Sequence, residues 1–449
     1  MINNINLIFF LIFILISGCS FDNKSGIWDG EEDEKIKISD LEKRQKEIVD
    51  IYKVYTSNTT YSKEVSLSEK ILLSKPKKNL SWKMSALNNQ NFLGNIYLPS
   101  VENNFLKKKI GKNKFFISKL KTPFLIINNN IIISDDRGTI YNINNKGKLK
   151  WKKNIYKKTY KNIYKNLVFS IYKNIIYVAD NIGFIYAIDL KNGNIIWIKN
   201  NSIPLKSNIK VYDNKIFLID YDNKIISLNI NDGSKVWQVL SISSFIKSQS
   251  LLSLAVSTEG DLIAINSSAD LFKIEANSGN TFWSKNFAKL VTLDATDFLE
   301  TSQILLSDDD IIFSADSSIY SYNILSSITN WETQVSSTDV PIVDGNNIFI
   351  VTKNGYFVIL NKNNGKIISS NYILKILKKK KRDTNITGFI MGSGKIYSVT
   401  LNGFLIVSSA VSGKVEKYIK IGETIKSSPI INNGKLYILT ENSKIYGFK

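Results

Sequence analysis

Short apolar runs, each ending in a polar turn, recur along the chain from about residue 125 to the last residue. The stretch "DNIGFIYAIDLKNGNIIW" (180–197) shows the pattern most fully. Its apolar residues predict a strand over 185–190 and a return strand over 194–197, joined by the turn "KNG". Gly193 is expected to supply the positive φ that this turn requires. The stretch is therefore predicted to be a β-hairpin that ends in Trp197.

The same hairpin is repeated with the spacing A-x-D-x-x-x-G-x-x-x-W. Further copies are "SLNINDGSKVW", "KIEANSGNTFW", the degraded "SYNILSSITNW", and "YNINNKGKLKW" with a turn one residue shorter; "ILNKNNGKIIS" and "VSSAVSGKVEK" keep the glycine without the tryptophan. The predicted structural positions are Trp151, Trp197, Trp237, Trp283 and Trp331, with Gly147, Gly193, Gly233, Gly279, Gly365 and Gly413.

The turns recur about every 44 residues, with several short strands in each unit, which is typical of propeller blades. The last unit, "KLYILTENSKIYGFK", stops one strand short of a full blade. An open strand edge favours aggregation, so the segment "VENNFLKKKIG" (101–111) is predicted to supply the missing strand. The expected fold is all-β, an eight-bladed β-propeller closed by an N-terminal strand.

The N-terminus predicts export. The apolar run "LIFFLIFILI" (7–16) is too short to span a bilayer but suits a signal peptide. It is followed by Ser17, Gly18 and Cys19, and "ISGC" resembles a bacterial lipobox, which predicts acyl chains on Cys19. The alternative is an ordinary signal peptide with a chance cysteine, and the absence of Lys and Arg from residues 1–6 favours it. The residues that follow Cys19 resemble those of lipoproteins sent to the outer membrane. The predicted organisation is a signal peptide (1–18), a lipidated cysteine with a flexible polar tether (19–80), and a propeller (81–449).

The amino-acid composition excludes several kinds of catalytic and metal-binding site. The chain has one cysteine and no histidine, which excludes an intramolecular disulfide, a Cys/His zinc site and a histidine-dependent triad. The net charge of +20 would suit nucleic acid or an anionic membrane. The abundance of Lys, Asn and Ile instead indicates genome composition as the cause. One basic run, "KILKKKKR" (375–382), is interpreted as a solvated insertion, with anionic lipid or an acidic partner as the alternative.

The repeat resembles the tryptophan-docked repeat of quinoprotein (PQQ) alcohol dehydrogenases. Together with the lipobox and "SWKMSALNNQNFLGNIYLPSVENNFLKKKIG" (81–111), it resembles more closely the BamB family of the outer-membrane β-barrel assembly machinery. This resemblance implies a lipid-anchored scaffold on the periplasmic side of the outer membrane, without catalytic residues, metal or cofactor. Its implied partners are the periplasmic domains of the barrel-inserting subunit and unfolded outer-membrane proteins, with no nucleic acid.

The alternative is a PQQ-dependent dehydrogenase, whose propeller would hold a quinone and a calcium ion. Such enzymes are usually longer, and many carry a vicinal disulfide that one cysteine cannot form. The acidic run "SDDDI" (307–311) falls at a turn and is interpreted as solvated.

The resemblance also implies an interface on two neighbouring inter-blade loops. One carries an apolar and basic cluster, which corresponds here to Phe245, Ile246 and Lys247, and the other carries acidic residues, which correspond to Asp294, Asp297 and Glu300. Lysine replaces the family's more frequent arginine at 247, which puts a bidentate contact in doubt. The alternative is that Phe245 and Ile246 pack beneath their own loop.

Overall fold

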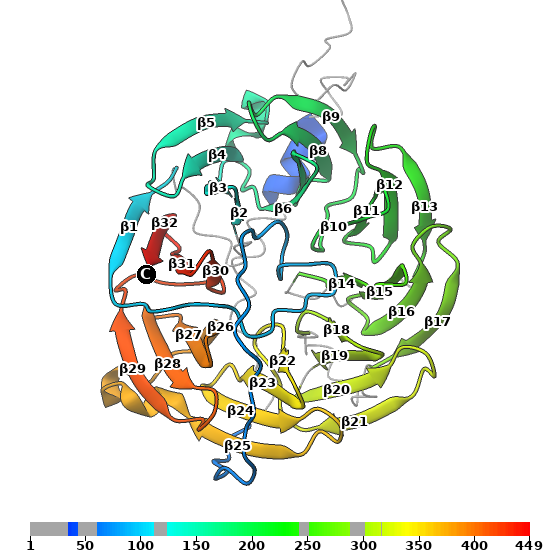
Figure 1. Cartoon of the computed structure of the whole chain (residues 1–449). Coiled ribbons are helices and arrows are strands. Elements are labelled where there is room, and N and C mark those ends of the chain that lie inside the picture. Colours follow the sequence, from blue (N-terminus) through cyan, green and yellow to red (C-terminus); the bar gives the residue numbers. More distant parts are fainter. Residues whose placement is uncertain (1–34, 44–60, 112–123, 242–250, 288–300, 316) are drawn as a thin grey trace, which may run out of the picture.

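The computed structural model describes residues 35–43, 61–111, 124–241, 251–287, 301–315 and 317–449. These residues form eight four-stranded antiparallel sheets arranged as blades around a ring (Figure 1). The predicted eight-bladed β-propeller is therefore confirmed.

Each blade runs from an innermost to an outermost strand in chain order. Blades 1 to 4 consist of β2 (Leu125–Ile127), β3 (Asn130–Ser134), β4 (Thr139–Asn144) and β5 (Leu149–Asn154); β6 (Leu167–Tyr172), β7 (Ile175–Asp180), β8 (Phe184–Asp189) and β9 (Ile195–Asn200); β10 (Lys210–Tyr212), β11 (Lys215–Ile219), β12 (Ile225–Asn229) and β13 (Lys235–Val239); and β14 (Leu254–Val256), β15 (Asp261–Ile265), β16 (Asp270–Glu275) and β17 (Thr281–Asn286).

Blades 5 to 7 follow the same plan. They consist of β18 (Leu305–Ser307), β19 (Asp310–Ala315), β20 (Ser318–Asn323) and β21 (Thr329–Thr333); β22 (Ile342–Asp344), β23 (Asn347–Val351), β24 (Tyr356–Asn361) and β25 (Ile367–Tyr372); and β26 (Ile386–Gly392), β27 (Lys395–Thr400), β28 (Phe404–Ser409) and β29 (Val415–Lys420). The inter-blade loops carry the 3-10 helices η2 (Lys158–Asn162), η3 (Ile373–Ile376) and η4 (Lys379–Lys381), and residues 35–43 form a helix.

Blade 8 joins the two ends of the described chain. It contains β30 (Ile430–Asn432), β31 (Lys435–Leu439) and β32 (Lys444–Phe448), with β1 (Asn104–Lys109) as its outermost strand. β1 pairs antiparallel with β32, and the backbone groups of Asn103 and Lys449 exchange two hydrogen bonds of 3.1 and 2.9 Å. The predicted closure of the ring by the 101–111 segment is confirmed.

The middle strands of the blades explain the near-continuous apolar runs in the sequence. Five of the six residues in β7 and in β8 are buried, because neighbouring blades cover both faces of each sheet. The outer strand β9 contains no buried residue. Burial thus decreases from the inner strands to the rim, and the core is distributed between the blades.

The repeat tryptophans connect each blade to the next. In blade 2, Trp197 lies opposite Ala187, and its indole Nε1–H donates to the carbonyl of Ile230 in blade 3 at 3.1 Å. The other four tryptophans donate in the same way to Leu190, Ala276, Ile324 and Lys362, at 2.8–3.3 Å. Because a buried indole needs an acceptor, each tryptophan fixes the angle between two blades as well as filling the space between them.

The repeat glycines lie beneath these rings. Gly193, at φ 76°, would place a Cβ atom only 2.8 Å from Cε3 of Trp151 in the preceding blade. Gly233, Gly279 and Gly365 face Trp197, Trp237 and Trp331 in the same way. Blade 8 lacks a tryptophan, and Leu106 of β1 takes its place, with Cδ1 3.3 Å from the corresponding position on Gly147. Four of the repeat glycines thus provide both the turn conformation and the space for a tryptophan ring, whereas Gly413 faces the side chain of Asn371.

Candidate partner-binding face

The strand order gives the ring two different faces. One face carries the tight turns between the first and second and between the third and fourth strands of each blade, and we call it the turn face. The opposite face carries the turns between the second and third strands and the longer inter-blade loops, and we call it the loop face. Both predicted interface loops join an outermost strand to the next innermost strand, so they leave the ring on the loop face, one blade apart.

The described residues define where these two loops begin and end. The first follows β13 and returns to β14, and the second follows β17 and returns to β18. Phe245, Ile246 and Lys247, and likewise Asp294, Asp297 and Glu300, lie outside the described residues, as does Cys19. Their assignment as interface residues and lipidation site stays a prediction.

The returning ends of both loops are held against neighbouring strands. The N–H of Leu252 donates to the carbonyl of Lys206 at 2.9 Å, and Leu252 itself is completely buried. In the second loop, the N–H of Ser302 donates to the carbonyl of Ser314 at 2.9 Å. On the outgoing side of the first loop, Leu240 is 65% exposed. Both loops thus return to fixed points on a rigid ring, which suits a binding surface.

An N-terminal segment crosses the turn face. Residues 61–101, which we call the axial segment, begin beside β25 and then pass over the centre of the ring (Figure 1). The segment contacts every blade through Trp82 with Ile126, Met84 with Ser170, Asn89 with Val211, Asn91 with Leu254 and Ile304, Val65 with Ser370, Ile96 with Gly392, and Asn79 with Ile431. Residues 61–80, expected as part of the tether, are therefore hydrogen-bonded to the propeller.

A buried lysine holds the axial segment near its midpoint. Asn91 is completely buried, and its Nδ2 donates to the carbonyls of Leu254 and Ile304, at 3.0 and 2.6 Å. Lys210 of blade 3, also completely buried, donates from Nζ to Asn91 Oδ1 and to the carbonyl of Asn88, both at 2.6 Å. Burial lowers the pKa of Lys210 to about 7. This network connects the segment to three blades at once.

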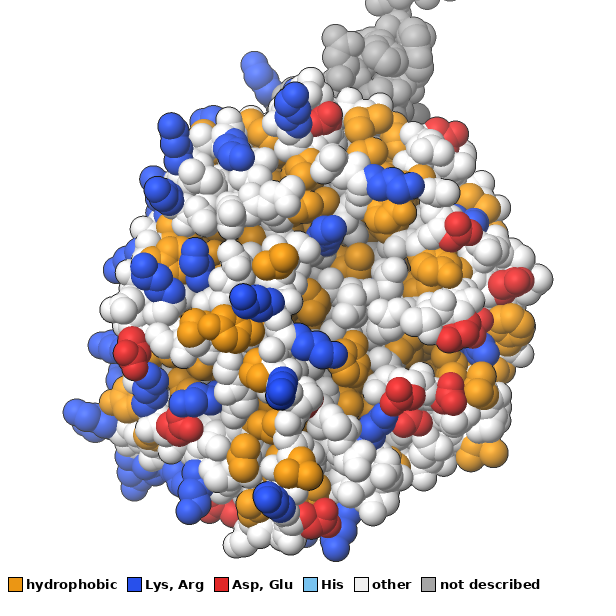
Figure 2. All heavy atoms as spheres, viewed as in Figure 1, with side chains coloured by type: hydrophobic (Ala, Val, Ile, Leu, Met, Phe, Trp, Pro, Cys, Tyr) orange, Lys and Arg blue, Asp and Glu red, His pale blue; other side chains and the backbone are white. Residues whose placement is uncertain are grey.

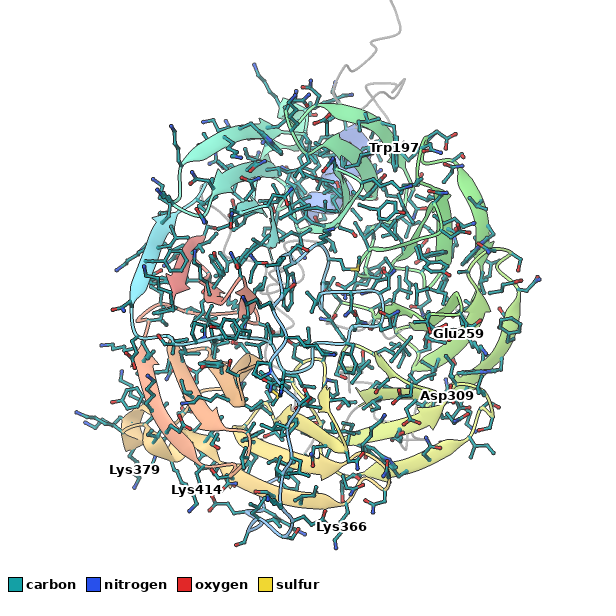
Figure 3. All side chains as sticks on the ribbon, viewed as in Figure 1. Trp197, Glu259, Asp309, Lys366, Lys379 and Lys414 are labelled. Carbon is teal, nitrogen blue, oxygen red and sulfur yellow. The ribbon has the colours of Figure 1, made fainter. Side chains whose placement is uncertain are left out.

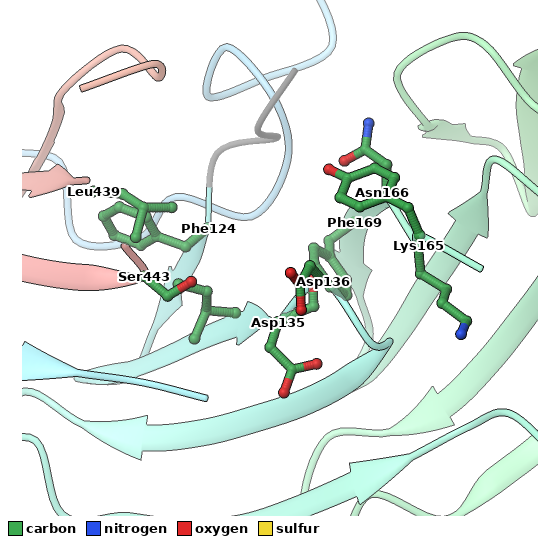
Figure 4. A pocket seen from close by; sticks show the side chains of 11 residues that line it. Phe124, Asp135, Asp136, Lys165, Asn166, Phe169, Leu439 and Ser443 are labelled. Atoms are coloured by element: carbon green, nitrogen blue, oxygen red, sulfur yellow. The ribbon is translucent and has the colours of Figure 1, made fainter. Parts of the chain in front are cut away.

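A small polar cavity lies on the loop face between blades 8, 1 and 2. Its lining includes Asp135, Asp136, Lys165 and Ser443 (Figure 4), and its volume is about 30 Å³. Burial lowers the pKa of Lys165 to about 8, against the opposing effect of Asp180, Asp135 and Asp136. The volume is close to that of a single water molecule, whereas small-molecule sites usually measure hundreds of cubic ångströms.

The described residues near the ring centre do not fit a quinone with a calcium ion. On the turn face, the side chains of Asn91 and Lys210 bond to each other, and they also bond to the carbonyls of Leu254, Ile304 and Asn88. On the loop face, the polar cavity is too small for a fused-ring cofactor. Throughout the described ranges, no group of three or more His, Cys, Asp or Glu residues is arranged to hold a metal ion.

The helix formed by residues 35–43 also lies on the loop face. Lys37 Nζ is 3.5 Å from Asn200 Oδ1 and 5.2 Å from the centre of the Phe184 ring, and Leu41 is buried. A space of about 290 Å³ separates the helix from Ile182 and Pro204. In the part of the chain that the structure describes, no helix has the length and apolarity to cross a membrane.

The fold and its repeat place this chain among the β-propellers with quinoprotein-type repeats. A family model described as "Outer membrane protein assembly factor BamB" matches residues 136–371, which is just over half of the chain. The chain belongs to this family, as its repeat predicted. A comparison with curated protein sequences found no match.

Solved structures agree on the fold. BamB from Moraxella catarrhalis superposes with a TM-score of 0.65 at 11% identity, covering 77% of this chain and 99% of that one. Quinohemoprotein alcohol dehydrogenase ADHIIG from Pseudomonas putida HK5 has a TM-score of 0.58 at 10% identity, covering 83% and 80%. The corresponding enzyme from Comamonas testosteroni has a TM-score of 0.58 at 9% identity, covering 82% and 80%.

Proposed function

We propose that this protein is a non-enzymatic scaffold of outer-membrane protein assembly, anchored by acyl chains on Cys19 at the periplasmic face of the outer membrane. It binds the periplasmic domains of the barrel-inserting subunit and assists the insertion of outer-membrane β-barrel proteins. The observation that carries the proposal is membership of the BamB family, whose model matches from the third strand of blade 1 to the last strand of blade 6.

The proposed binding site is the pair of loops that follow β13 and β17. Phe245 and Ile246 would supply the apolar centre, and Lys247 a single-point ionic contact in place of a bidentate one. Asp294, Asp297 and Glu300 would supply the acidic side. The fixed return points at Leu252 and Ser302 support this assignment, because they hold the described ends of both loops against neighbouring strands on one face of the ring.

The alternative is a PQQ-dependent dehydrogenase. Its support is the structural similarity of this chain to the two quinohemoprotein enzymes. Their likeness to this chain concerns the fold alone, and the residues at the ring centre do not suit the cofactor. We therefore favour the scaffold.

The test is affinity purification from membranes solubilised in mild detergent, followed by mass spectrometry of the recovered proteins. We expect a large outer-membrane barrel protein with periplasmic domains to co-purify. Phe245→Asp should reduce its recovery by about tenfold or more, the effect of removing a binding hot spot. Phe282→Asp is the matched control, because Phe282 is 57% exposed and lies at the turn-face end of the outer strand β17, opposite the end from which the second loop leaves.

Two results would contradict the proposal. One is a purified protein that carries bound quinone and calcium and no barrel protein, which would favour the dehydrogenase. The other is equal loss of the partner in Phe245→Asp and Phe282→Asp, which would remove the first loop from the interface.

A further inference from the structure

The rim of the ring is divided by charge. The outer strands β29, β1 and β5, with the sequences VEKYIK, NFLKKK and LKWKKN, contain eight lysines and one acidic residue. The outer strands β13, β17 and β21, on the other side of the ring, contain two lysines and one acidic residue. Figure 2 shows Lys and Arg side chains gathered along the side of the ring that holds β29, β1 and β5.

The turns increase this difference. The turns next to β5 and β29 add exposed lysines at 146, 148 and 414, whereas those of blades 3 to 5 carry exposed acidic residues, among them Asp232, Glu259 and Asp309. Figure 3 shows Glu259 and Asp309 on the opposite side of the ring from Lys379 and Lys414. Genome composition would add lysines to the whole surface, and it does not account for their segregation.

The lysines form one continuous surface across blades 7, 8 and 1. We define the basic rim as the exposed residues Lys107, Lys108, Lys109, Lys146, Lys148, Lys150, Lys152, Lys414 and Lys420. The turn at Gly147 packs against the side chains of Leu106 and Lys108, which joins blade 1 to β1. Lys417 Nζ lies 3.9 Å from a carboxylate oxygen of Glu102, just before β1, which joins blade 7 to it. The exposed lysines of η4, Lys379 to Lys381, lie in the loop that precedes blade 7.

We propose that the basic rim binds the surface of a bilayer rich in anionic phospholipid. Nine ammonium groups spread over three strands and their adjoining turns match a plane of phosphates, whereas a single phosphate ligand would need convergent donors in a pocket. The lysines are point charges on flexible stems, which suits a fluid headgroup layer that offers no fixed geometry. This inference rests on the proposed membrane location, which brings such a surface within reach. The protein would then lie edge-on to the membrane, held by its acyl chains and by this rim.

The test uses the full lipidated chain, reconstituted on vesicles of phosphatidylcholine alone or mixed with phosphatidylglycerol. Each lysine is then acetylated by an amine-reactive reagent, and its rate is read by mass spectrometry. On anionic vesicles at low salt, we expect Lys107 to Lys109 to react about fivefold more slowly than on neutral vesicles. The reason is that contact with an anionic surface strengthens the binding of each lysine by about that factor. High salt should restore the rate, since it screens the attraction.

The controls are Lys199, Lys235 and Lys285, which are equally exposed on the outer strands β9, β13 and β17. Their rates should be the same on both vesicles. The variant K107Q/K108Q/K109Q should lose most of the protection at Lys146 and Lys148, whereas K199Q/K235Q/K285Q should keep it.

Equal rates on the two vesicles, or equal protection of the control lysines, would overturn the proposal. Protection that appears only when an acidic partner protein is added would also overturn it, in favour of a protein contact. The anchor is tested separately by flotation with neutral vesicles. A chain that floats without rim protection contradicts only the basic rim, and a chain that does not float contradicts the proposed anchoring.

Discussion

A glycine that lies beneath a docked tryptophan provides a quantitative test of how the blades are joined. Gly365, at φ 70°, lies under Trp331, and a Cβ atom there would be 2.4 Å from Cε3 and 2.6 Å from Cδ2 of the indole. Trp331 is only 8% exposed and is fixed by its hydrogen bond to the carbonyl of Lys362 at 2.8 Å. The ring therefore has little room to move away from an added methyl group.

The expected cost of Gly365→Ala has two parts. An L-residue in the left-handed region costs about 1–2 kcal/mol relative to glycine. Forcing a methyl group into a packed contact costs about 1–3 kcal/mol more. Gly422→Ala is the matched control, because Gly422 has φ 82° with no atom within 4 Å of its Cβ position. Gly422→Ala should therefore lose only the backbone contribution to stability. The free energies of unfolding of the two variants should differ by the packing contribution, about 1–3 kcal/mol.

The assay is urea unfolding followed by far-ultraviolet circular dichroism. Gly365→Ala should unfold at a lower urea concentration than Gly422→Ala. In a Trp331→Leu background the ring is absent and Thr333 Oγ1 stays close, 2.7 Å from the Cβ position, so the cost of Gly365→Ala should fall toward that of the control substitution. Equal midpoints for the two glycine variants, or additive effects of Gly365→Ala and Trp331→Leu, would refute the proposed role of the ring.

Two further predictions concern the axial segment and the closing strand. Because burial lowers the pKa of Lys210 to about 7 from its ordinary value of 10.5, the unfolded chain binds an extra proton between these values. The free energy of unfolding should therefore rise as the pH increases from about 7 to about 10.5. The rise should be smaller in Lys210→Met, in which Lys165 and Lys206, whose pKa values burial lowers to about 8, still contribute; parallel urea midpoints for the two proteins across this range would contradict the prediction. Leu106→Asp places a carboxylate at a position that is 5% exposed, opposite Gly447, and should destabilise blade 8 by about 3–5 kcal/mol. Limited proteolysis should cut blade 8 faster in Leu106→Asp than in Lys108→Asp, which changes an exposed residue of the same strand; equal rates would show that β1 does not close the ring tightly.

The blades were predictable because their signal is local and repeated. The turn glycine, the returning strand and its tryptophan lie within about a dozen residues of one another, so one copy explains the others. The closing strand was predictable by counting, because the last unit lacked a strand. The packing of the closing strand was not predictable. Leu106 takes the place of a repeat tryptophan, and only its register opposite Gly447 shows that it occupies the tryptophan position.

The axial segment was missed because its contacts leave no periodic apolar pattern. Asn79, Asn89 and Asn91 bond to backbone carbonyls of inner strands, and such residues are equally typical of solvated linkers. The basic rim was missed for a different reason. Its lysines lie in three segments, near residues 107, 150 and 417, and only closure of the ring brings the first beside the last. The interface loops lie outside the described residues, so for them the resemblance is still the only guide.

The contacts of the axial segment also constrain the order in which parts of the protein fold. Ser74 contacts Asp344, 270 residues later, and Asn79 contacts Ile431, 352 residues later. Docking of the axial segment can therefore be completed only after blade 8 has been synthesised. Until then, carbonyls of the inner strands lack the amide donors of the segment, and β32 keeps an open edge until β1 pairs with it. Contacts this distant in sequence make folding slow, so these unpaired groups expose the folding chain to aggregation for longer.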